Sequence, residues 1–365
     1  MTSVGRQRAI LVTGGAGFIG SHLVESLLAR GDHVTVIDNL STGRLSNLDA
    51  AHATERSSDG KPRLRVIVRT VSDALPTMDP REFDEIYHLA AAVGVRLVIE
   101  EPIRTIETNV HESSAILRFA AEGRVPLLLA STSEVYGKSA KTPFSEDDDV
   151  TYGPTTLSRW SYACSKAIDE YLALAYHAQH RLPVTIVRFF NTVGPRQVGR
   201  YGMVLPRFVK AALRGEPLEV HGDGSQSRCF CDVRDTVPAL IRLVADGQHA
   251  GRVFNIGRDT PISIRSLAET VLKTLGREAP LRFVPYEEAF VAGFDDLLVR
   301  QPDLRRVRAA VGFSPSISLE QTIRDIAAEF RVRPEADAPD LARPGAASRA
   351  TASTQALPGT SGGRL

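Results

Sequence analysis

Two groups of side chains in this sequence have the types and spacing that acid–base chemistry needs. The stretch "LASTSEVYG" places Thr132, Ser133 and Glu134 together directly after an apolar run. The stretch "SYACSK" places Tyr162 four residues before Lys166, so the two side chains share one face of a helix. A neighbouring ammonium favours the phenolate and lowers the pKa of a tyrosine from its usual value of about 10. Such a tyrosine can take the proton of a substrate hydroxyl.

A glycine-rich turn near the N-terminus is typical of a dinucleotide site. In "VTGGAGFIGSH", three glycines between an apolar run and a helical pattern allow a tight turn and close approach of a pyrophosphate. The helix N-terminus that follows favours negative charge. Asp38 ends the next apolar run and can accept hydrogen bonds from a ribose diol, which favours NAD over NADP because the carboxylate repels a 2′-phosphate. The residues predicted to bind NAD here are Gly14, Gly17, Phe18, Ile19, Gly20, Asp38 and Asn39.

The elements that must position these groups alternate between short apolar runs and longer helical patterns. Continuous apolar runs imply a sheet covered on both faces, and helices between them imply parallel βαβ units. The sequence therefore predicts an α/β fold with a doubly wound parallel sheet of the Rossmann type. Its predicted strands are residues 9–15, 33–39, 64–68, 85–91, 125–131 and 184–190.

The pattern changes after about residue 191. Helices are predicted at residues 204–214 and 262–275, interspersed with "LEVHGDG" and "GRVFNIG". This indicates a smaller C-terminal α/β part packed over the sheet edge, with a cleft for a small ligand. We therefore expect an NAD-binding domain at residues 1–190 and a nucleotide-sugar-binding part at residues 191–332. Residues 333–365 are rich in Ala, Pro, Gly, Ser and Thr and are predicted to be a disordered tail.

Composition narrows the classes of partner. The chain has 365 residues, 43% of them hydrophobic, and a net charge of +1, which gives no reason to expect nucleic acid. No apolar run reaches the roughly 18 residues of a membrane span, and residues 1–8 lack the apolar core of a signal peptide, so no membrane is expected. Three cysteines make neither a disulfide framework nor a zinc set, so no metal and a reducing cytoplasm are expected.

Taken together, these motifs resemble the extended short-chain dehydrogenase/reductase family of nucleotide-sugar epimerases, dehydratases and decarboxylases. The resemblance covers roughly residues 10–330 and includes "TGGAGFIGSH", "IDN", "YHLAA", "ASTSEVYG", the Tyr162/Lys166 pair, "RFFNTVGPR" and "GDGSQSRCFCDVRD". It implies NAD as cofactor and a UDP-sugar as substrate. By resemblance, Thr132 and Tyr162 contact the 4-hydroxyl of the sugar, and Lys166 also holds the nicotinamide ribose.

The resemblance implies further binding residues as well as two departures. Leu89, Ala90 and Ala91 of "YHLAA" would lie against NAD. Residues 69–71 hold no counterpart of the Asp that often contacts adenine in the family, and His221 replaces a usual Tyr. The residues expected on the UDP-sugar side are Arg96, Asn191, Val204, Arg207, Arg228 and Arg300.

Members of this family begin alike, with oxidation at C4 of the sugar, and differ in what the 4-keto sugar then does. A simple 4-epimerase needs no acid or base near C5. A 4,6-dehydratase must remove the C5 proton, and a decarboxylase of a 6-carboxylate must return a proton to C5, so both need a group there. Glu134 therefore argues against the simplest epimerase but does not separate the other two.

Other stretches favour decarboxylation of UDP-glucuronic acid to UDP-xylose or its 4-keto pentose. "GPTTLSRWSYACSK", "RCFCDVRD" and "RQPDL" resemble UDP-glucuronate decarboxylases, in which Ser133, Glu134 and Arg300 would belong to the decarboxylation site. "AAAVGVRLVIEEP" resembles epimerases more, so a 4-epimerase of UDP-glucose or UDP-glucuronate is the next alternative, followed by a 4,6-dehydratase. A non-catalytic dinucleotide-binding protein is disfavoured because Tyr162 and Lys166 are both present.

Assembly is also predicted. Two long helices expected at residues 103–122 and 161–180 carry more apolar residues than one sheet-facing stripe needs. In the family that the chain resembles, these helices pair across a two-fold axis into a four-helix bundle. We therefore expect a homodimer with an isologous interface, in which the same patch is used on both subunits.

Overall fold

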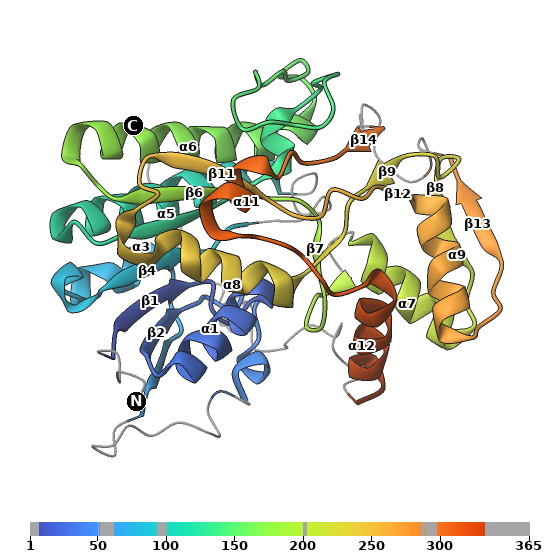
Figure 1. The fold of residues 1–365 in the computed structure, drawn as a ribbon, viewed down its shortest axis with the longest axis horizontal. Coiled ribbons are helices and arrows are strands. Elements are labelled where there is room, and N and C mark those ends of the chain that lie inside the picture. Colours follow the sequence, from blue (N-terminus) through green and yellow to red (C-terminus); the bar gives the residue numbers. More distant parts are fainter. Residues whose placement is uncertain are drawn as a thin grey trace, which may run out of the picture.

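The structure, a computed structural model, describes residues 7–49, 51, 62–92, 101–199, 203–285, 288 and 298–332. Its centre is a parallel sheet of seven strands in the order β11-β6-β5-β4-β1-β2-β3 (Figure 1). The predicted doubly wound α/β fold is confirmed. The strands are β1 (Ala9–Thr13), β2 (His33–Ile37), β3 (Leu64–Ile67), β4 (Glu85–His88), β5 (Leu127–Thr132), β6 (Val184–Phe189) and β11 (Arg252–Ile256).

Helices cover both faces of this sheet, which explains why its strands are continuous apolar runs. On one face, α1 (Phe18–Arg30) and α8 (Val233–Val244) pack into a core with β1, β2 and α11 (Arg305–Val311). On the other face lie α3 (Val71–Ala74), α5 (Pro102–Gly123) and α6 (Ser161–His180). Each face therefore has its own hydrophobic core, and the carboxyl ends of the strands are left as the edge where polar side chains collect.

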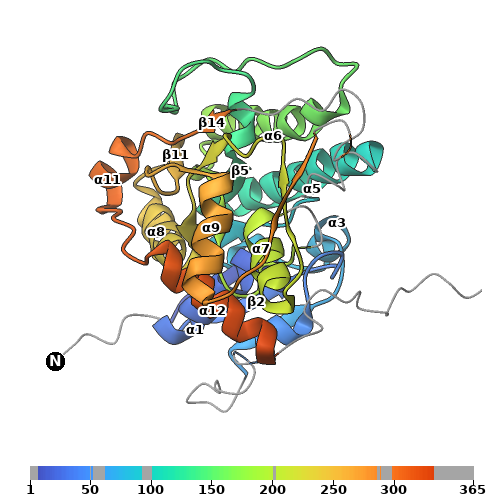
Figure 2. The same cartoon turned by 90° about the vertical axis from the view of Figure 1, so that its right-hand side faces the viewer.

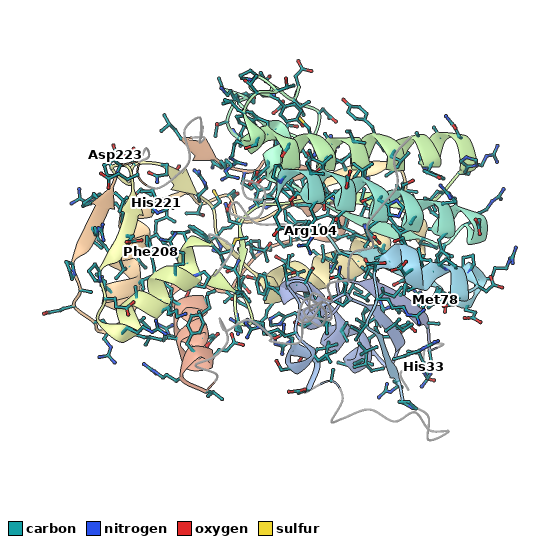
Figure 3. All side chains as sticks on the ribbon, turned by 180° about the vertical axis from the view of Figure 1, so that it is seen from behind. His33, Met78, Arg104, Phe208, His221 and Asp223 are labelled. Carbon is teal, nitrogen blue, oxygen red and sulfur yellow. The ribbon has the colours of Figure 1, made fainter. Side chains whose placement is uncertain are left out.

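A smaller lobe sits beyond the carboxyl ends of the strands (Figures 1 and 2). Its core contains buried residues of its helices, including Phe208, which Figure 3 labels together with His221. Its main elements are α7 (Val204–Arg214), β8 (Leu218–His221), α9 (Ile264–Leu275), β13 (Leu281–Val284) and α12 (Leu319–Val332). This lobe faces the sheet edge where the first half of the chain places its candidate site.

Short elements connect these parts. The two-residue strands are β7 (Thr192–Val193), β9 (Ser227–Arg228), β10 (Cys231–Asp232), β12 (Ile262–Ser263) and β14 (Val299–Arg300). The 3-10 helices are η1 (Leu45–Leu48), η2 (Leu75–Thr77), η3 (Pro80–Glu82), η4 (Ser133–Tyr136), η5 (Ser158–Trp160) and η7 (Ala245–Gly247). Two of these 3-10 helices, η4 and η5, flank the start of α6 and carry site residues.

One predicted assignment is wrong and another is shifted. The stretch "GRVFNIG", which the sequence assigns to the smaller part, contains β11, and this strand extends the main sheet beside β6. The helix expected from residue 262 begins at Ile264, because Ile262 and Ser263 pair with β9 and the Ser263 hydroxyl accepts the Ser266 N–H as an N-cap. The predicted disordered tail lies outside the described residues.

The described residues offer neither a membrane-spanning helix nor a metal-binding cluster. None of their helices is long and apolar enough to cross a membrane. Within the same residues, no group of three or more His, Cys, Asp or Glu side chains is arranged to hold a metal ion.

Candidate active site

The turn between β1 and α1 has no room for side chains at two of its glycines. Gly14 has a φ of +72°, and a Cβ there would lie 2.8 Å from the backbone nitrogen of Ala90. A Cβ on Gly20 would lie 2.1 Å from the carbonyl oxygen of Gly14. Real Cβ atoms do not approach backbone atoms so closely, so only glycine allows this turn to close. Gly17 is the N-cap of α1, and Phe18 and Ile19 begin the helix.

Asp38 follows β2 and faces this turn. Its carboxylate is 7% exposed and accepts the N–H groups of Ala16 at 2.9 Å and Leu40 at 2.8 Å. Burial raises the pKa of Asp38, and these backbone hydrogen bonds act in the opposite direction. Each carboxylate oxygen has two lone-pair sites, so both retain capacity for a ligand hydroxyl. Asn39, beside it, is exposed.

The residues after β4 complete this cradle. The Leu89 N–H donates to the carbonyl of Thr13, and the Ala90 N–H donates to the Thr13 hydroxyl at 3.3 Å. These bonds hold Leu89 and Ala90 directly beside Gly14, and Ala91 follows them in the chain. A helix N-terminus, a turn free of side chains and a carboxylate at the end of the next strand fit the phosphates and ribose of a dinucleotide. The residues present therefore fit NAD.

Thr132, Glu134 and Tyr162 meet where β5 ends and α6 begins. Thr132 is the N-cap of η4, and its hydroxyl accepts the Glu134 N–H at 3.2 Å. Tyr162 lies in the first turn of α6, is 8% exposed and is hydrogen-bonded to Thr132. Ser133 is buried at 3% exposure. The strand end thus delivers one hydroxyl and one carboxylate to the tyrosine.

The Glu134 carboxylate lies between two guanidinium groups. Arg159 of η5 donates to one of its oxygens at 2.5 Å, and Arg300 of β14 donates to the other at 3.5 Å. All three side chains are mostly buried, at 16% exposure or less. Burial acts to raise the pKa of Glu134, yet the two arginines lower it to about 2. Glu134 is therefore a carboxylate at neutral pH.

The expected effect of Lys166 on Tyr162 needs correction. The Lys166 ammonium donates to Asp169 at 2.7 Å, and both side chains are nearly fully buried. Burial raises the pKa of Tyr162, and the negative charges of Glu134 and Asp169 raise it further. The pKa of Tyr162 in the free protein therefore lies above its usual value and not below it, chiefly because the side chain is buried and faces two carboxylates.

Arg300 and Arg228 are neighbours across the small sheet of the second lobe. They are paired in register between β14 and β9. The segment after Arg300 is fixed by Phe144, whose N–H donates to the Gln301 carbonyl and whose carbonyl accepts the Asp303 N–H, both at 2.8 Å. This attachment brings the second lobe's arginine to the Glu134 of the first.

The other predicted substrate residues are more dispersed. Asn191 has a φ of +31° and donates to the Cys229 carbonyl at 3.5 Å. Val204 begins α7, and Arg207, one turn later, pairs with Glu219 at 3.4 Å. Arg96 lies outside the described residues.

Sequence reasoning missed Arg159 and Asp169. Asp169 stands three residues after Lys166 on one helix, and that spacing was a usable signal of an ion pair. Arg159 carried no such signal, because its partner Glu134 is 25 residues away and on another element.

Comparison with known proteins agrees with this arrangement. A model of the "NAD dependent epimerase/dehydratase family" matches residues 10–257, more than half of the chain. The chain belongs to this family. It is therefore an enzyme with NAD as its cofactor, as the sequence predicted.

Relatives and a solved structure extend the comparison. The chain is 40% identical to the UDP-N-acetyl-alpha-D-glucosaminuronate decarboxylase of Bacillus cytotoxicus, over 89% of this chain and 98% of that protein. It is 37% identical to UDP-glucuronic acid decarboxylase 4 of Arabidopsis thaliana, over 89% of this chain and 69% of that protein. The structure of DesIV, a dTDP-glucose 4,6-dehydratase from Streptomyces venezuelae with NAD bound, matches with a TM-score of 0.77 and 30% identity, over 89% and 98% of the two chains.

Proposed function

We propose that this family member decarboxylates a UDP-sugar that carries a carboxylate at C6, through a 4-keto intermediate. The observation that carries the proposal is the cluster of Arg159, Glu134 and Arg300. It brings two positive charges to one negative charge in a mostly buried site, and a second carboxylate would balance it. The named relatives act on UDP-glucuronic acid and on its N-acetylglucosamine counterpart, so both sugars are candidates.

The first step needs a base at the 4-hydroxyl. NAD, when bound in the cradle of the β1–α1 turn, supplies the acceptor for the hydride of C4. Thr132 and Tyr162 hold the 4-hydroxyl, and Tyr162 takes its proton when it is in the phenolate form. Lys166, on the same face of α6, holds the nicotinamide ribose. The hydrogen bond between Thr132 and Tyr162 aligns the two hydroxyl groups for this contact.

The second step uses the guanidinium groups and Glu134. A ketone at C4 makes the 6-carboxylate a β-keto acid, which loses CO2 and leaves an enolate that must gain a proton at C5. Arg159 and Arg300 are placed to hold the substrate carboxylate. When they turn toward it, Glu134 loses the partners that keep its pKa near 2, and its pKa rises toward the range of a proton carrier. Ser133, buried beside Glu134, belongs to the same site.

The test is to incubate the protein with NAD and either UDP-glucuronic acid or UDP-N-acetylglucosaminuronic acid, and to read the product mass. Loss of CO2 alone, with the hydride returned to C4, or loss of CO2 and two hydrogen atoms, with the 4-keto pentose released and NADH formed, supports the proposal. Arg300→Ala should weaken binding of these two sugars far more than binding of UDP-glucose, because the lost partner is the carboxylate. Equal weakening of all three would mean that Arg300 reads only the diphosphate.

The same experiment separates the alternatives. An unchanged mass with a new retention time would identify a 4-epimerase, which the family description also includes. Loss of water from UDP-glucose would identify a 4,6-dehydratase. Tight NAD binding with no turnover on any UDP-sugar would leave a non-catalytic dinucleotide-binding protein.

We further propose a homodimer built on α5 and α6, which lie side by side (Figure 3). Four large apolar side chains are exposed on these two helices: Ile103, Ile106, Ile168 and Tyr171. A second copy of the chain would cover them.

We place the enzyme in the cytoplasm, since its three cysteines are free, as in a reducing compartment. Residues 1–190 would bind NAD and residues 191–332 the nucleotide sugar.

A further inference from the structure

A buried ion pair lies directly behind the candidate acid–base tyrosine. Lys166 donates to Asp169 at 2.7 Å, with side-chain exposures of 3% and 0%. We propose that Asp169 is a positioning residue, which holds the Lys166 ammonium in place and sets the pH range in which Tyr162 exchanges its proton. This inference rests on the proposed role of Tyr162 as the base of the reaction.

Stability alone is a poor reason for this pair. A surface pair at this helical spacing adds little stability, whereas the burial of two ionised groups imposes a desolvation cost that exceeds this gain. Apolar residues of the same volume would fill the space equally well. A carboxylate at this position is therefore better explained by what it does to the lysine and the tyrosine.

The other polar and charged side chains around α6 either hydrogen-bond to Asp169, are neutral, or form ion pairs with other residues. Ser113 on α5 is hydrogen-bonded to Asp169 and also lies 3.4 Å from the ring nitrogen of His88. Burial, and then the charge of Lys166, lower the pKa of His88 to about 3, so this histidine is neutral. Glu170, the next residue on α6, pairs with Arg188 of β6 at 2.7 Å. Asp169 is thus the carboxylate that compensates the lysine.

The charges that face Tyr162 come from three elements. Glu134 of η4 and Asp169 of α6 oppose the phenolate, while Arg159 of η5 favours it. Glu134 is itself balanced by Arg159 and Arg300. Removing the charge of Asp169 takes away one repulsion and leaves the Lys166 ammonium uncompensated. Both changes favour the phenolate, so the pKa of Tyr162 must fall.

The test is Asp169→Asn in the full-length enzyme, with two readouts. In the pH profile of kcat/KM, we expect the acid limb to move to lower pH by about one unit or more. In absorption titrations, the phenolate signal of Tyr162, isolated by subtracting the same protein with Tyr162→Phe, should appear at lower pH. Asp169→Glu keeps the charge and should retain the wild-type profile. Glu269→Gln, an exposed change on α9, controls for net charge.

The outcomes are distinct. An acid limb at its wild-type pH, with kcat lowered equally at every pH, would reduce Asp169 to a packing residue and overturn the inference. Asp169→Ala is a second neutral variant for the case in which the amide prevents folding, and the same shift is expected. If the phenolate titration shifts but no UDP-sugar is turned over, the inference stands and the proposed function fails. If turnover is present and neither readout shifts, the inference fails alone.

Discussion

In the free enzyme Glu134 is a deprotonated carboxylate. Its proposed task, the delivery of a proton to C5, requires the protonated acid. Burial would raise its pKa, but Arg159 and Arg300 lower it to about 2. A general acid works best with a pKa near the working pH. The free enzyme therefore keeps Glu134 unable to donate a proton, and a substrate carboxylate that competes for the two guanidiniums would change this. Substrates without that carboxylate would leave Glu134 as it is.

Glu134→Gln keeps the side-chain volume and removes the proton transfer. We expect kcat on a carboxylate-bearing UDP-sugar to fall by about 10²- to 10⁴-fold. KM should not rise, because the two arginines lose their internal competitor. Steady-state kinetics measure both values, and Glu82→Gln, an exposed change on η3, is the matched control. Full activity in Glu134→Gln would count against decarboxylation and favour a 4-epimerase.

Asp38 should decide the choice between NAD and NADP. Its carboxylate faces the glycine turn, where a 2′-phosphate would meet a like charge. Asp38→Ala should weaken NAD binding and narrow the gap between NAD and NADP, as measured by the two Kd values. Equal Kd values for NAD and NADP in the wild type would show that this role of Asp38 is wrong.

Most candidate residues that could be predicted carry a local signal, although Asp169 was missed despite its helical spacing from Lys166. Tyr162 and Lys166 are one helical turn apart, so sequence spacing places them together. Sequence spacing does not show that the Lys166 ammonium also pairs with Asp169, because this contact depends on side-chain packing. Arg159 reaches Glu134 only because η4 and η5 both flank α6, which no periodicity records.

At the scale of elements, the turn between β1 and α1 depends on a close backbone approach. We expect Gly20→Ala to abolish NAD binding, because its Cβ would lie 2.1 Å from the Gly14 carbonyl oxygen and the turn would have to open. Gly276→Ala is a useful control. Gly276 has a φ of +58° with open space around it, so the change costs about 1 kcal/mol of strain and leaves NAD binding intact. Calorimetric titration with NAD measures the difference, and unchanged binding by Gly20→Ala would contradict it.

Strands with uninterrupted apolar runs were predictable, and β11 was not. Its Asn255 interrupts the run with a polar residue, yet this side chain is fully buried. It accepts from the Tyr136 hydroxyl at 2.7 Å and donates to the Phe144 carbonyl at 2.9 Å, so its burial is satisfied by groups far away in the sequence. Strands of two residues, such as β9 and β14, are too short to show any period.

At the scale of the whole molecule, the buried His88 should make stability depend on pH. Its ring lies 2.8 Å from the Thr13 hydroxyl, and its pKa is lowered from 6.5 to about 3, first by burial and then by Lys166. Between these values the unfolded state binds the proton and the folded state does not. Folding stability is therefore lost as pH falls from 6.5 toward 3, by up to about 5 kcal/mol. Denaturant unfolding of His88→Gln should show a flatter pH dependence over this range, and an unchanged slope would exclude His88 as its source.

The proposed homodimer rests on the apolar side chains that the fold leaves exposed on α5 and α6. Their inner faces pack into the hydrophobic core on one face of the sheet, but the side chains of Ile103 and Tyr171 on their outer faces are 71% and 69% exposed. Full burial of one such side chain contributes roughly 1.5–3 kcal/mol, and a two-fold axis counts each contact twice. The wild type should therefore have the mass of a dimer by light scattering at micromolar concentration.

Tyr171→Glu should shift it to the monomer, because the carboxylate would be desolvated in the interface. Phe283→Glu, a matched change at an exposed aromatic on β13, should remain dimeric. A wild type that is monomeric, or a Tyr171→Glu that stays dimeric while Phe283→Glu dissociates, would move the interface away from these two helices.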